Sequence, residues 1–334
     1  MSLSQKTIIL LGNVVLLWML ISTLVVSTFW ISASLTIVLA GVVKYFRIKP
    51  VPKSRTSERV RNLFEFDAEN HKNNTIFHKA GGLHAPENTL EAIAQAVKLG
   101  IPSIEVDLDF TKDDIGVLIH GPKVNDTTDG SGFVSDFTFE ELQKLNAAAK
   151  FANRNGFTAV RIPTLEACLE MCIQHKLVVF IDCKSNPEQT AKLISRLYKK
   201  YPDLYELGIV CSFYPSIIYA VRKADPAILT GLTHRNYILS LLGNGSERNN
   251  ELWKKFVSPW LDIALAWSHW AILWYICGNS FFLCCKDNVC LDNKKFWDSL
   301  GVTLVAWTVN DVAEKQFFLK SLKVPIITDG LHEL

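Results

Sequence analysis

The sequence has almost no excess of either charge. Its 334 residues include 35 Lys and Arg against 33 Asp and Glu, which gives a net charge of +2. The distribution is uneven, because residues 1–61 carry +7 and the rest of the chain carries −5. A nucleic-acid-binding protein needs its positive charge on the folded body, so nucleic acid is excluded as a partner. A hydrophobic content of 49% with 20% charged residues excludes a mostly disordered chain.

Cysteine is absent from the first half of the chain, and all eight cysteines lie between Cys168 and Cys290. A domain of this size builds its own core and does not need disulfides. None of the spacings matches a paired zinc ribbon. We therefore predict free structural thiols.

Charged residues are also missing from Thr7 to Val43, a stretch of 37 residues without Asp, Glu, Lys, Arg or His. A bilayer core needs about 20 apolar residues, and a secretory signal peptide has an apolar region of only about 7–15. We predict a transmembrane anchor over residues 1–45. Two short spans, Ile8–Leu24 and Ile31–Tyr45 with a turn near Ser27-Thr28, are the favoured arrangement, and one tilted span is the alternative.

Residues 46–73 form a basic linker that would fix the orientation of this anchor. Seven basic residues between Lys44 and Arg61 place that flank in the cytosol by the positive-inside rule. Three glycosylation sequons, at Asn73, Asn125 and Asn244, instead favour a lumenal glycoprotein. The sequence therefore predicts an integral protein of the endomembrane or plasma membrane, with the side of the folded domain left open.

Residues 74–334 are predicted to form a TIM (β/α)8 barrel. Short β-rich runs alternate with helical patterns, as expected for parallel βα units. A doubly wound open sheet is the competing architecture. The eight expected strands are Thr75–Lys79, Ser103–Asp109, Gly116–His120, Leu177–Lys184, Leu207–Phe213, Ile228–Thr233, Val302–Thr308 and Pro325–Thr328.

Residues 235–292 interrupt this alternation between the sixth and seventh expected strands. They contain the apolar run Phe256–Leu283, which is rich in tryptophan. A membrane span here would prevent the last strands from rejoining the sheet. We predict a helical insertion that contacts membrane lipid through its tryptophans.

Acidic side chains recur on the strand faces that are expected to point into the barrel. In Ser103–Asp109, the alternation places Glu105, Asp107 and Asp109 on one face. Asp182 and Lys184 lie on one face of the next long strand. Buried neighbouring carboxylates repel one another unless a cation neutralises them, and oxygen ligands suit a hard divalent ion. Solvated acids on an edge strand and a simple Asp182–Lys184 ion pair are the alternatives.

Two histidines, His78 and His120, end two of the expected strands. Imidazole titrates near neutrality, so a pair can divide the acid and base roles in a displacement at phosphorus. Gly81-Gly82 lets the backbone approach a ligand closely, and the helix that follows Asn88 offers an N-terminus for an anion. Trp307, near the end of the seventh expected strand, and Asn310, just after it, would form a stacking wall and a polar contact.

In combination, these residues resemble the glycerophosphodiester phosphodiesterase family. Within it, the chain looks most like the membrane-anchored type described as the membrane-interacting protein of an RGS regulator. The resemblance covers roughly residues 74–330 and rests on an ordered set of motifs. These are His78-Lys79-Ala80-Gly81-Gly82, Pro86-Glu87-Asn88-Thr89, Glu105-Val106-Asp107, Thr111-Lys112-Asp113, His120, Asp126-Thr127-Thr128-Asp129-Gly130, Ile181-Asp182-Cys183-Lys184, Cys211-Ser212-Phe213 and Trp307-Thr308-Val309-Asn310.

The resemblance implies a TIM barrel and a role for each site residue. His78 and His120 would be the catalytic acid/base pair, and Glu105, Asp107 and Asp182 would bind Mg²⁺ or Ca²⁺. The implied reaction hydrolyses a glycerophosphodiester, such as glycerophosphoinositol, to sn-glycerol 3-phosphate and an alcohol. The residues expected to contact the substrate are Lys79, Glu87, Lys184, Trp307 and Asn310.

Three motifs depart from the family pattern. Lys79-Ala80 replaces Arg-Gly, Gly121 follows His120 where the family has Asp, and Asp126 stands where an Arg is usual. Lysine lacks the bidentate fork with which arginine holds a phosphate. We expect an enzyme that is slower or has a shifted substrate preference. The alternatives are lysophospholipase D activity on membrane lipid, or a catalytically silent barrel that binds a lipid headgroup or a protein partner.

Overall fold

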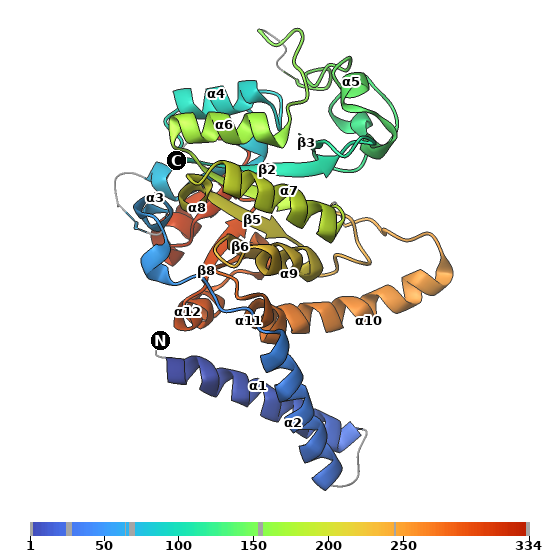
Figure 1. The fold of residues 1–334 in the computed structure, drawn as a ribbon, viewed down its shortest axis with the longest axis vertical. Coiled ribbons are helices and arrows are strands. Elements are labelled where there is room, and N and C mark those ends of the chain that lie inside the picture. The colour runs from blue at the N-terminus through green and yellow to red at the C-terminus, as the bar shows by residue number, and fades with distance from the viewer. Residues whose placement is uncertain are drawn as a thin grey trace.

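The computed structural model describes residues 3–24, 29–63, 65–66, 71–152, 156–243 and 245–331. The side chains of residues 3–9, 23–24 and 29–31 are not part of this description. A pair of N-terminal helices lies at one end of the molecule, and a sheet surrounded by helices makes up the rest (Figure 1).

Eight parallel strands form a closed barrel, in agreement with the predicted architecture. Each strand pairs with its neighbours in parallel, and the first strand pairs with both the second and the last, which closes the sheet. The barrel strands are β1 (Thr75–Phe77), β2 (Ser103–Phe110), β4 (Val178–Cys183), β5 (Gly208–Ser212), β6 (Leu229–His234), β7 (Phe281–Cys285), β8 (Thr303–Trp307) and β9 (Ile326–Thr328).

Two strand assignments differ from those predicted. Gly116–Leu118 forms β3, which pairs with β2 in antiparallel fashion and is not a barrel strand. The reason is the short connection between them, since a parallel crossover takes a dozen or more residues. The missing barrel strand is β7, whose sequence Phe-Phe-Leu-Cys-Cys follows directly on an apolar helical stretch that hides its pattern. The predicted number of eight barrel strands is right. The prediction is wrong in including Gly116–His120 and in missing Phe281–Cys285.

Helices cover the outside of the barrel, and side-chain caps start several of them. Thr89, Thr164 and Asn186 accept hydrogen bonds from backbone amides of the first turn of α4, α6 and α7. Apolar faces of these helices pack on the alternate side chains of the strands. The barrel helices are α4 (Leu90–Lys98), α5 (Phe139–Leu142), α6 (Leu165–His175), α7 (Pro187–Lys200), α8 (Leu204–Leu207), α9 (Pro215–Ala224), α12 (Leu291–Leu300) and α13 (Val312–Gln316).

The helical insertion is shorter than predicted and lies between the fifth and sixth barrel strands. It runs from the end of β6 to the start of β7, so residues 281–292 belong to the barrel and not to the insertion. Its elements are α10 (Leu252–Ser268), the π-helical turn η6 (His269–Leu273) and α11 (Trp274–Cys277). Figure 1 shows α10 as an arm that extends away from the barrel.

The N-terminal helices α1 (Leu3–Leu24) and α2 (Phe29–Phe46) overlap the two predicted spans. Over the described residues, no helix has both the length and the apolar character that crossing a membrane requires. The predicted transmembrane anchor therefore has no support from these helices. The expected turn at Ser27-Thr28 and the sequon residue Asn244 lie outside the described residues, whereas Asn73 and Asn125 are exposed.

Arg222, on α9, joins three parts of the molecule. Its fully buried guanidinium donates to the carbonyl oxygens of Lys49 (2.5 Å), Cys277 (3.4 Å), Ile228 (2.8 Å) and Pro226. These oxygens belong to the N-terminal linker, the end of the insertion and the entry to β6. One side chain therefore connects the linker, the insertion and the barrel.

The predicted free thiols are confirmed for all eight cysteines.

Candidate active site

Three carboxylates meet inside the barrel, as the strand alternation predicts. Asp107 and Asp182 are paired in register on the adjacent strands β2 and β4, and Glu105 lies two residues before Asp107. All three are buried, and one oxygen of each lies within 4.8 Å of the others. Burial and the charge of Asp107 raise the pKa of Glu105 to about 8. A positive charge bound among the three acids would relieve this repulsion and favour the ionised form of Glu105.

A second observation also indicates that these three carboxylates suit a divalent cation. Asp182 Oδ1 is buried and has no hydrogen-bond partner among the described residues. A buried, unpaired carboxylate oxygen is costly unless a further ligand satisfies it. Oxygen donors from three carboxylates are those that Mg²⁺ and Ca²⁺ take. Asp109, which was expected on the same face, instead accepts from Ser185 Oγ at 2.6 Å and stays outside the group.

Lys184 balances part of this negative charge. Its Nζ donates to Asp107 Oδ1 and lies 3.1 Å from Asp182 Oδ2. Burial lowers the pKa of Lys184, but the charges of Asp182 and Asp107 outweigh burial and raise it. For Asp107, burial alone would raise the pKa, but the charge of Lys184 outweighs burial and holds the pKa of Asp107 well below its usual range. The predicted substrate-contacting lysine therefore lies directly beside the predicted metal ligands.

The loop between β1 and α4 carries two of the predicted site residues, Lys79 and Glu87, and also Asn88 to the same place. The backbone amide of Lys79 donates to Glu105 Oε2 at 2.9 Å, and Lys79 Nζ lies 3.0 Å from both oxygens of Glu87. Asn88 exchanges two hydrogen bonds with Asp107, each of 2.9 Å, through the side chain and the backbone amide of that residue. Lys79, Ala80 and Asn88 all have positive φ. The loop therefore donates hydrogen bonds to two of the three carboxylates, from the Lys79 amide to Glu105 and from the Asn88 side chain to Asp107.

His78 is held by a residue that the sequence analysis missed. Its Nδ1 makes a 2.6 Å hydrogen bond with Asp329 Oδ1, and its Nε2 lies 4.0 Å from Glu105 Oε2. Burial lowers the pKa of His78, but the bond to Asp329 and the charges of Glu105 and Asp329 outweigh burial and raise it. Asp329 directly follows β9, so the strand-end rule that found the other polar residues also applies to it.

Asn310 supports Asp329 from the neighbouring strand end. Its Nδ2 donates to Asp329 Oδ2 at 2.5 Å, while its Oδ1 accepts from the Asp329 amide at 2.9 Å and from Thr328 Oγ1 at 3.1 Å. Asn310 was expected to contact the substrate. The structure places its amide in the network behind His78.

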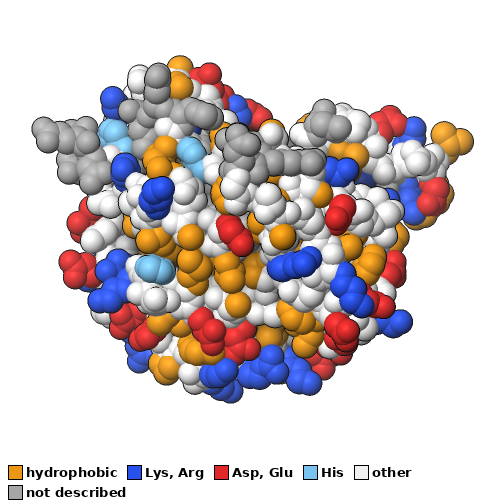
Figure 2. All heavy atoms as spheres, turned by 90° about the horizontal axis from the view of Figure 1, so that it is seen from above, with side chains coloured by type: hydrophobic (Ala, Val, Ile, Leu, Met, Phe, Trp, Pro, Cys, Tyr) orange, Lys and Arg blue, Asp and Glu red, His pale blue; other side chains and the backbone are white. Residues whose placement is uncertain are grey.

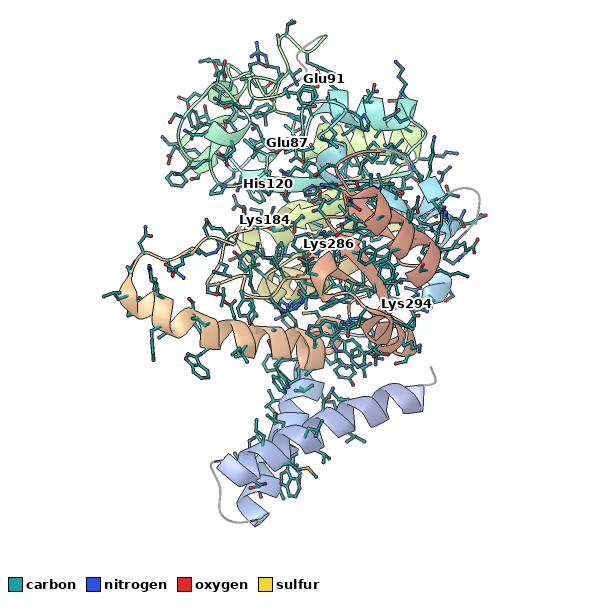
Figure 3. All side chains as sticks on the ribbon, turned by 180° about the vertical axis from the view of Figure 1, so that it is seen from behind. Glu87, Glu91, His120, Lys184, Lys286 and Lys294 are labelled. Atoms are coloured by element: carbon teal, nitrogen blue, oxygen red, sulfur yellow. The ribbon has the colours of Figure 1, made fainter. Side chains whose placement is uncertain are left out.

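His120 follows β3, so the antiparallel excursion from β2 delivers the second histidine. Burial lowers the pKa of His120 to about 4, partly offset by the charge of Asp107. Burial therefore favours the neutral form of the His120 ring, whereas the pKa of His78 is shifted upward. Figure 3 shows Glu87, His120 and Lys184 in succession along one side of the barrel, with Lys294 away from them.

Trp307 and a pocket border the site. The Trp307 ring meets Phe213 edge-on at 5.4 Å between centroids, at the ends of β8 and β5. A pocket of about 260 Å³ opens beside Glu87. It is lined by Gly82, Leu83, Pro86, Glu87, Asp126, Thr127, Ala147, Lys150, Phe151 and Ala152. Two of the three departures from the family pattern, Lys79 and Asp126, therefore lie at or next to this pocket.

Comparisons with known proteins identify the family of this chain. Residues 78–333 match the model of the Glycerophosphoryl diester phosphodiesterase family. Glycerophosphodiester phosphodiesterase 1 of Homo sapiens is 40% identical over 292 residues, which cover 87% of this chain and 86% of the relative. Glycerophosphodiester phosphodiesterase of Caldanaerobacter subterraneus is 38% identical over 263 residues, covering 78% and 95%.

Solved structures share the fold at low identity. A phosphodiesterase of Oleispira antarctica, in complex with the product sn-glycerol-3-phosphate, superposes with a TM-score of 0.60 at 20% identity and covers 76% of this chain and 92% of its own. A glycerophosphodiester phosphodiesterase of Agrobacterium tumefaciens gives a TM-score of 0.58 at 20% identity, with 77% and 96% covered. The chain belongs to the glycerophosphodiester phosphodiesterase family and is an enzyme of that activity.

Proposed function

We propose that this enzyme hydrolyses glycerophosphodiesters in a reaction that depends on a divalent cation and on two histidines, and that it releases sn-glycerol 3-phosphate and an alcohol. The observation that carries the proposal is the buried group of Glu105, Asp107 and Asp182 beside His78. The product follows that of the Oleispira antarctica relative, whose structure holds sn-glycerol-3-phosphate.

Glu105, Asp107 and Asp182 are the residues that would hold the cation. When bound, Mg²⁺ or Ca²⁺ would supply Lewis-acid polarisation of a phosphoryl oxygen. Lys184 adds a fixed positive charge on the same side of the site, where it offsets the negative charge of the substrate phosphate. The identity of the ion stays a prediction.

The two histidines divide the proton transfers by their contacts. Asp329 stabilises the imidazolium form of His78 through a 2.6 Å hydrogen bond, so His78 serves as the acid that protonates the departing alkoxide. Burial favours the neutral form of the His120 ring and is only partly offset by the charge of Asp107. A neutral His120 accepts the proton of the attacking oxygen.

The pocket beside Glu87 is the proposed place for the substrate group beyond the phosphate. Its lining combines the apolar side chains of Leu83 and Phe151 with the charges of Glu87, Asp126 and Lys150. Such a mixture suits a polar alcohol such as inositol. A lysophospholipid substrate, membrane attachment through residues 1–45 and a protein partner stay predictions.

Release of sn-glycerol 3-phosphate from glycerophosphoinositol, with and without added Mg²⁺ or Ca²⁺, tests the proposal. The wild type should need the cation, and His120→Ala should lower kcat by about 10²–10⁴-fold, the usual contribution of a general acid or base. His175→Ala is the matched control, since His175 ends α6 outside the site and should leave the rate unchanged. Equal rates in the wild type and His120→Ala would exclude the two-histidine mechanism.

A further inference from the structure

Helix α10 exposes an unbroken apolar face. Eight of its large hydrophobic residues are between 39% and 84% exposed. At 100° per residue, these positions fall within one half of the helix circumference. The face consists of Leu252, Trp253, Phe256, Val257, Trp260, Leu261, Ile263 and Trp267.

The two buried residues of α10, Ser258 and Asp262, are polar and lie on the opposite side of the helix, the reverse of a helix in a water-soluble domain. Asp262 is only 3% exposed and accepts from the amides of Leu239 (2.8 Å) and Ser240 (3.0 Å) and from Ser240 Oγ (2.5 Å). Ser258 is 6% exposed and accepts from Asn249 at 3.3 Å. The helix is therefore fastened to the loop after β6 by polar contacts, and this fastening fixes its apolar face outward.

The end of the insertion contacts the N-terminal helices. Ala271, in the η6 turn that follows α10, accepts from Asn13 of α1 at 3.5 Å, and the Arg47 guanidinium lies 4.0 Å from the centre of the Tyr275 ring in α11. The helices α1 and α2 themselves carry exposed apolar side chains. Those that are more than half exposed are Leu11, Leu16, Met19, Leu20, Ile37, Val38 and Tyr45.

Basic residues border these apolar surfaces. Lys44 lies in the last turn of α2, and Arg47 and Lys49 follow it directly in the chain. Lys254 and Lys255 lie on α10 itself. The far end of the molecule, viewed from above in Figure 2, instead mixes acidic and basic side chains. Apolar surface bordered by cations complements the anionic headgroups and acyl chains of a lipid layer.

The free end of α10 also lies on the catalytic side of the barrel. The insertion begins directly after His234, at the carboxyl end of β6, and the site residues lie at the carboxyl ends of the other strands. In Figure 1, the arrowhead of β2 and the N-terminal end of α10, at Leu252, point to the same side of the molecule.

We propose that the apolar face of α10 inserts into the interfacial layer of an anionic lipid bilayer, and that this contact holds the catalytic side of the barrel against the membrane. Three tryptophans on the exposed face favour lipid over a protein partner, because the amphipathic indole ring is most stable at the level of the headgroups. The exposed apolar side chains of α1 and α2 would extend the same contact.

The native tryptophans of the full chain provide the test. Trp253, Trp260 and Trp267 are replaced together by Phe, which keeps the face apolar, and emission is recorded on phosphatidylcholine–phosphatidylserine vesicles with brominated acyl chains. The difference between wild type and the triple variant reports only these three side chains. We expect the brominated lipid to quench this difference emission. Trp297→Phe is the control, since Trp297 is fully buried in the barrel core and its difference emission should not be quenched.

Unquenched difference emission from the triple variant would overturn the proposal, because α10 would then lie outside the lipid. A wild type that is dimeric in vesicle-free buffer and that Phe256→Asp converts to a monomer would also overturn it, in favour of a second copy on this face. The triple variant should hydrolyse water-soluble glycerophosphoinositol at the wild-type rate. This readout separates a failure of membrane contact from a failure of the catalytic site.

Discussion

At the scale of single residues, His78 depends on a partner from the last strand of the barrel. Asp329 binds Nδ1 of His78 at 2.6 Å, and Asn310 binds the other oxygen of Asp329 at 2.5 Å. A carboxylate in this position fixes the ring orientation and stabilises its charged form. Asp329 is therefore a positioning residue, which acts on the reaction through His78.

Asp329→Asn should lower kcat by about 10–100-fold, the usual effect of losing a group that orients a site residue. Asp329 raises the pKa of His78, so its removal lowers that pKa. The protonated form of His78 is then lost at a lower pH, and the alkaline limb of the pH–rate profile should move to lower pH. Asp311→Asn, which alters only the exposed cap of α13, should leave the profile unchanged. An unshifted alkaline limb in Asp329→Asn would contradict the role of His78 as the acid.

Asp182→Asn tests the cation site without an activity assay. A ligand that binds only the native state at about 100 times its Kd stabilises that state by about 2.7 kcal/mol. Added Mg²⁺ or Ca²⁺ should therefore raise the Tm of the wild type by several degrees and that of Asp182→Asn by much less. Asp109→Asn is the matched control. Asp109 accepts a hydrogen bond from Ser185 and lies outside the carboxylate group, so this variant should keep the wild-type shift in Tm. Equal shifts in all three proteins would remove Asp182 from the site.

At the scale of elements, the loop from β1 to α4 places two glycines in different conformations. Gly81 has φ +101°, and a Cβ there would lie 2.6 Å from the Phe77 ring. Gly82 has ordinary φ, and its nearest neighbour would be 3.5 Å away, at Glu87. Only Gly81 is therefore required by the backbone.

Gly81→Ala should destabilise the protein by about 2–4 kcal/mol, from positive φ and overpacking together. Gly82→Ala should change the free energy of unfolding by less than about 1 kcal/mol, because its Cβ meets only ordinary contacts. Denaturant unfolding of both variants measures the difference. Similar losses in the two variants would show that the space beside Phe77 does not decide the loop conformation.

The elements also explain which parts of the fold the sequence could predict. The alternation of side chains in β2 correctly predicted that Glu105 and Asp107 lie inside the barrel. Both faces of this strand are buried, so its polar residues had only one possible position, in the barrel interior. The membership of β3 and β7 could not be predicted in the same way. A run of three to five apolar residues has no direction, and only pairing with its neighbours makes β3 antiparallel and β7 parallel.

At the scale of the whole molecule, Arg222 links the linker, the insertion and the barrel through four carbonyl oxygens. Its planar guanidinium can serve several acceptors at once, which the ammonium group of lysine cannot do in the same geometry. No motif in the sequence marks this residue, since its partners come from segments up to 173 positions away. Long-range contacts of this kind depend on tertiary packing alone.

Arg222→Met should lower the free energy of unfolding by about 3–5 kcal/mol, because it leaves several buried carbonyl groups without donors. Arg222→Lys should recover only a small part of this loss. Arg196→Met is the control on the exposed side of α7 and should stay within about 0.5 kcal/mol of the wild type. Full stability in Arg222→Lys would mean that charge alone, and not the shape of the guanidinium, holds the three parts together.

The bond between His78 and Asp329 has a consequence for biosynthesis. His78 lies at the end of β1 and Asp329 directly after β9, and these two strands pair to close the barrel. A nascent chain that has emerged from the ribosome as far as β8 carries both histidines and all three carboxylates, yet it lacks the group that orients its acid. Competence to cleave a phosphodiester should therefore arise late in translation, and no partly synthesised chain should attack cellular phosphodiesters before its barrel closes.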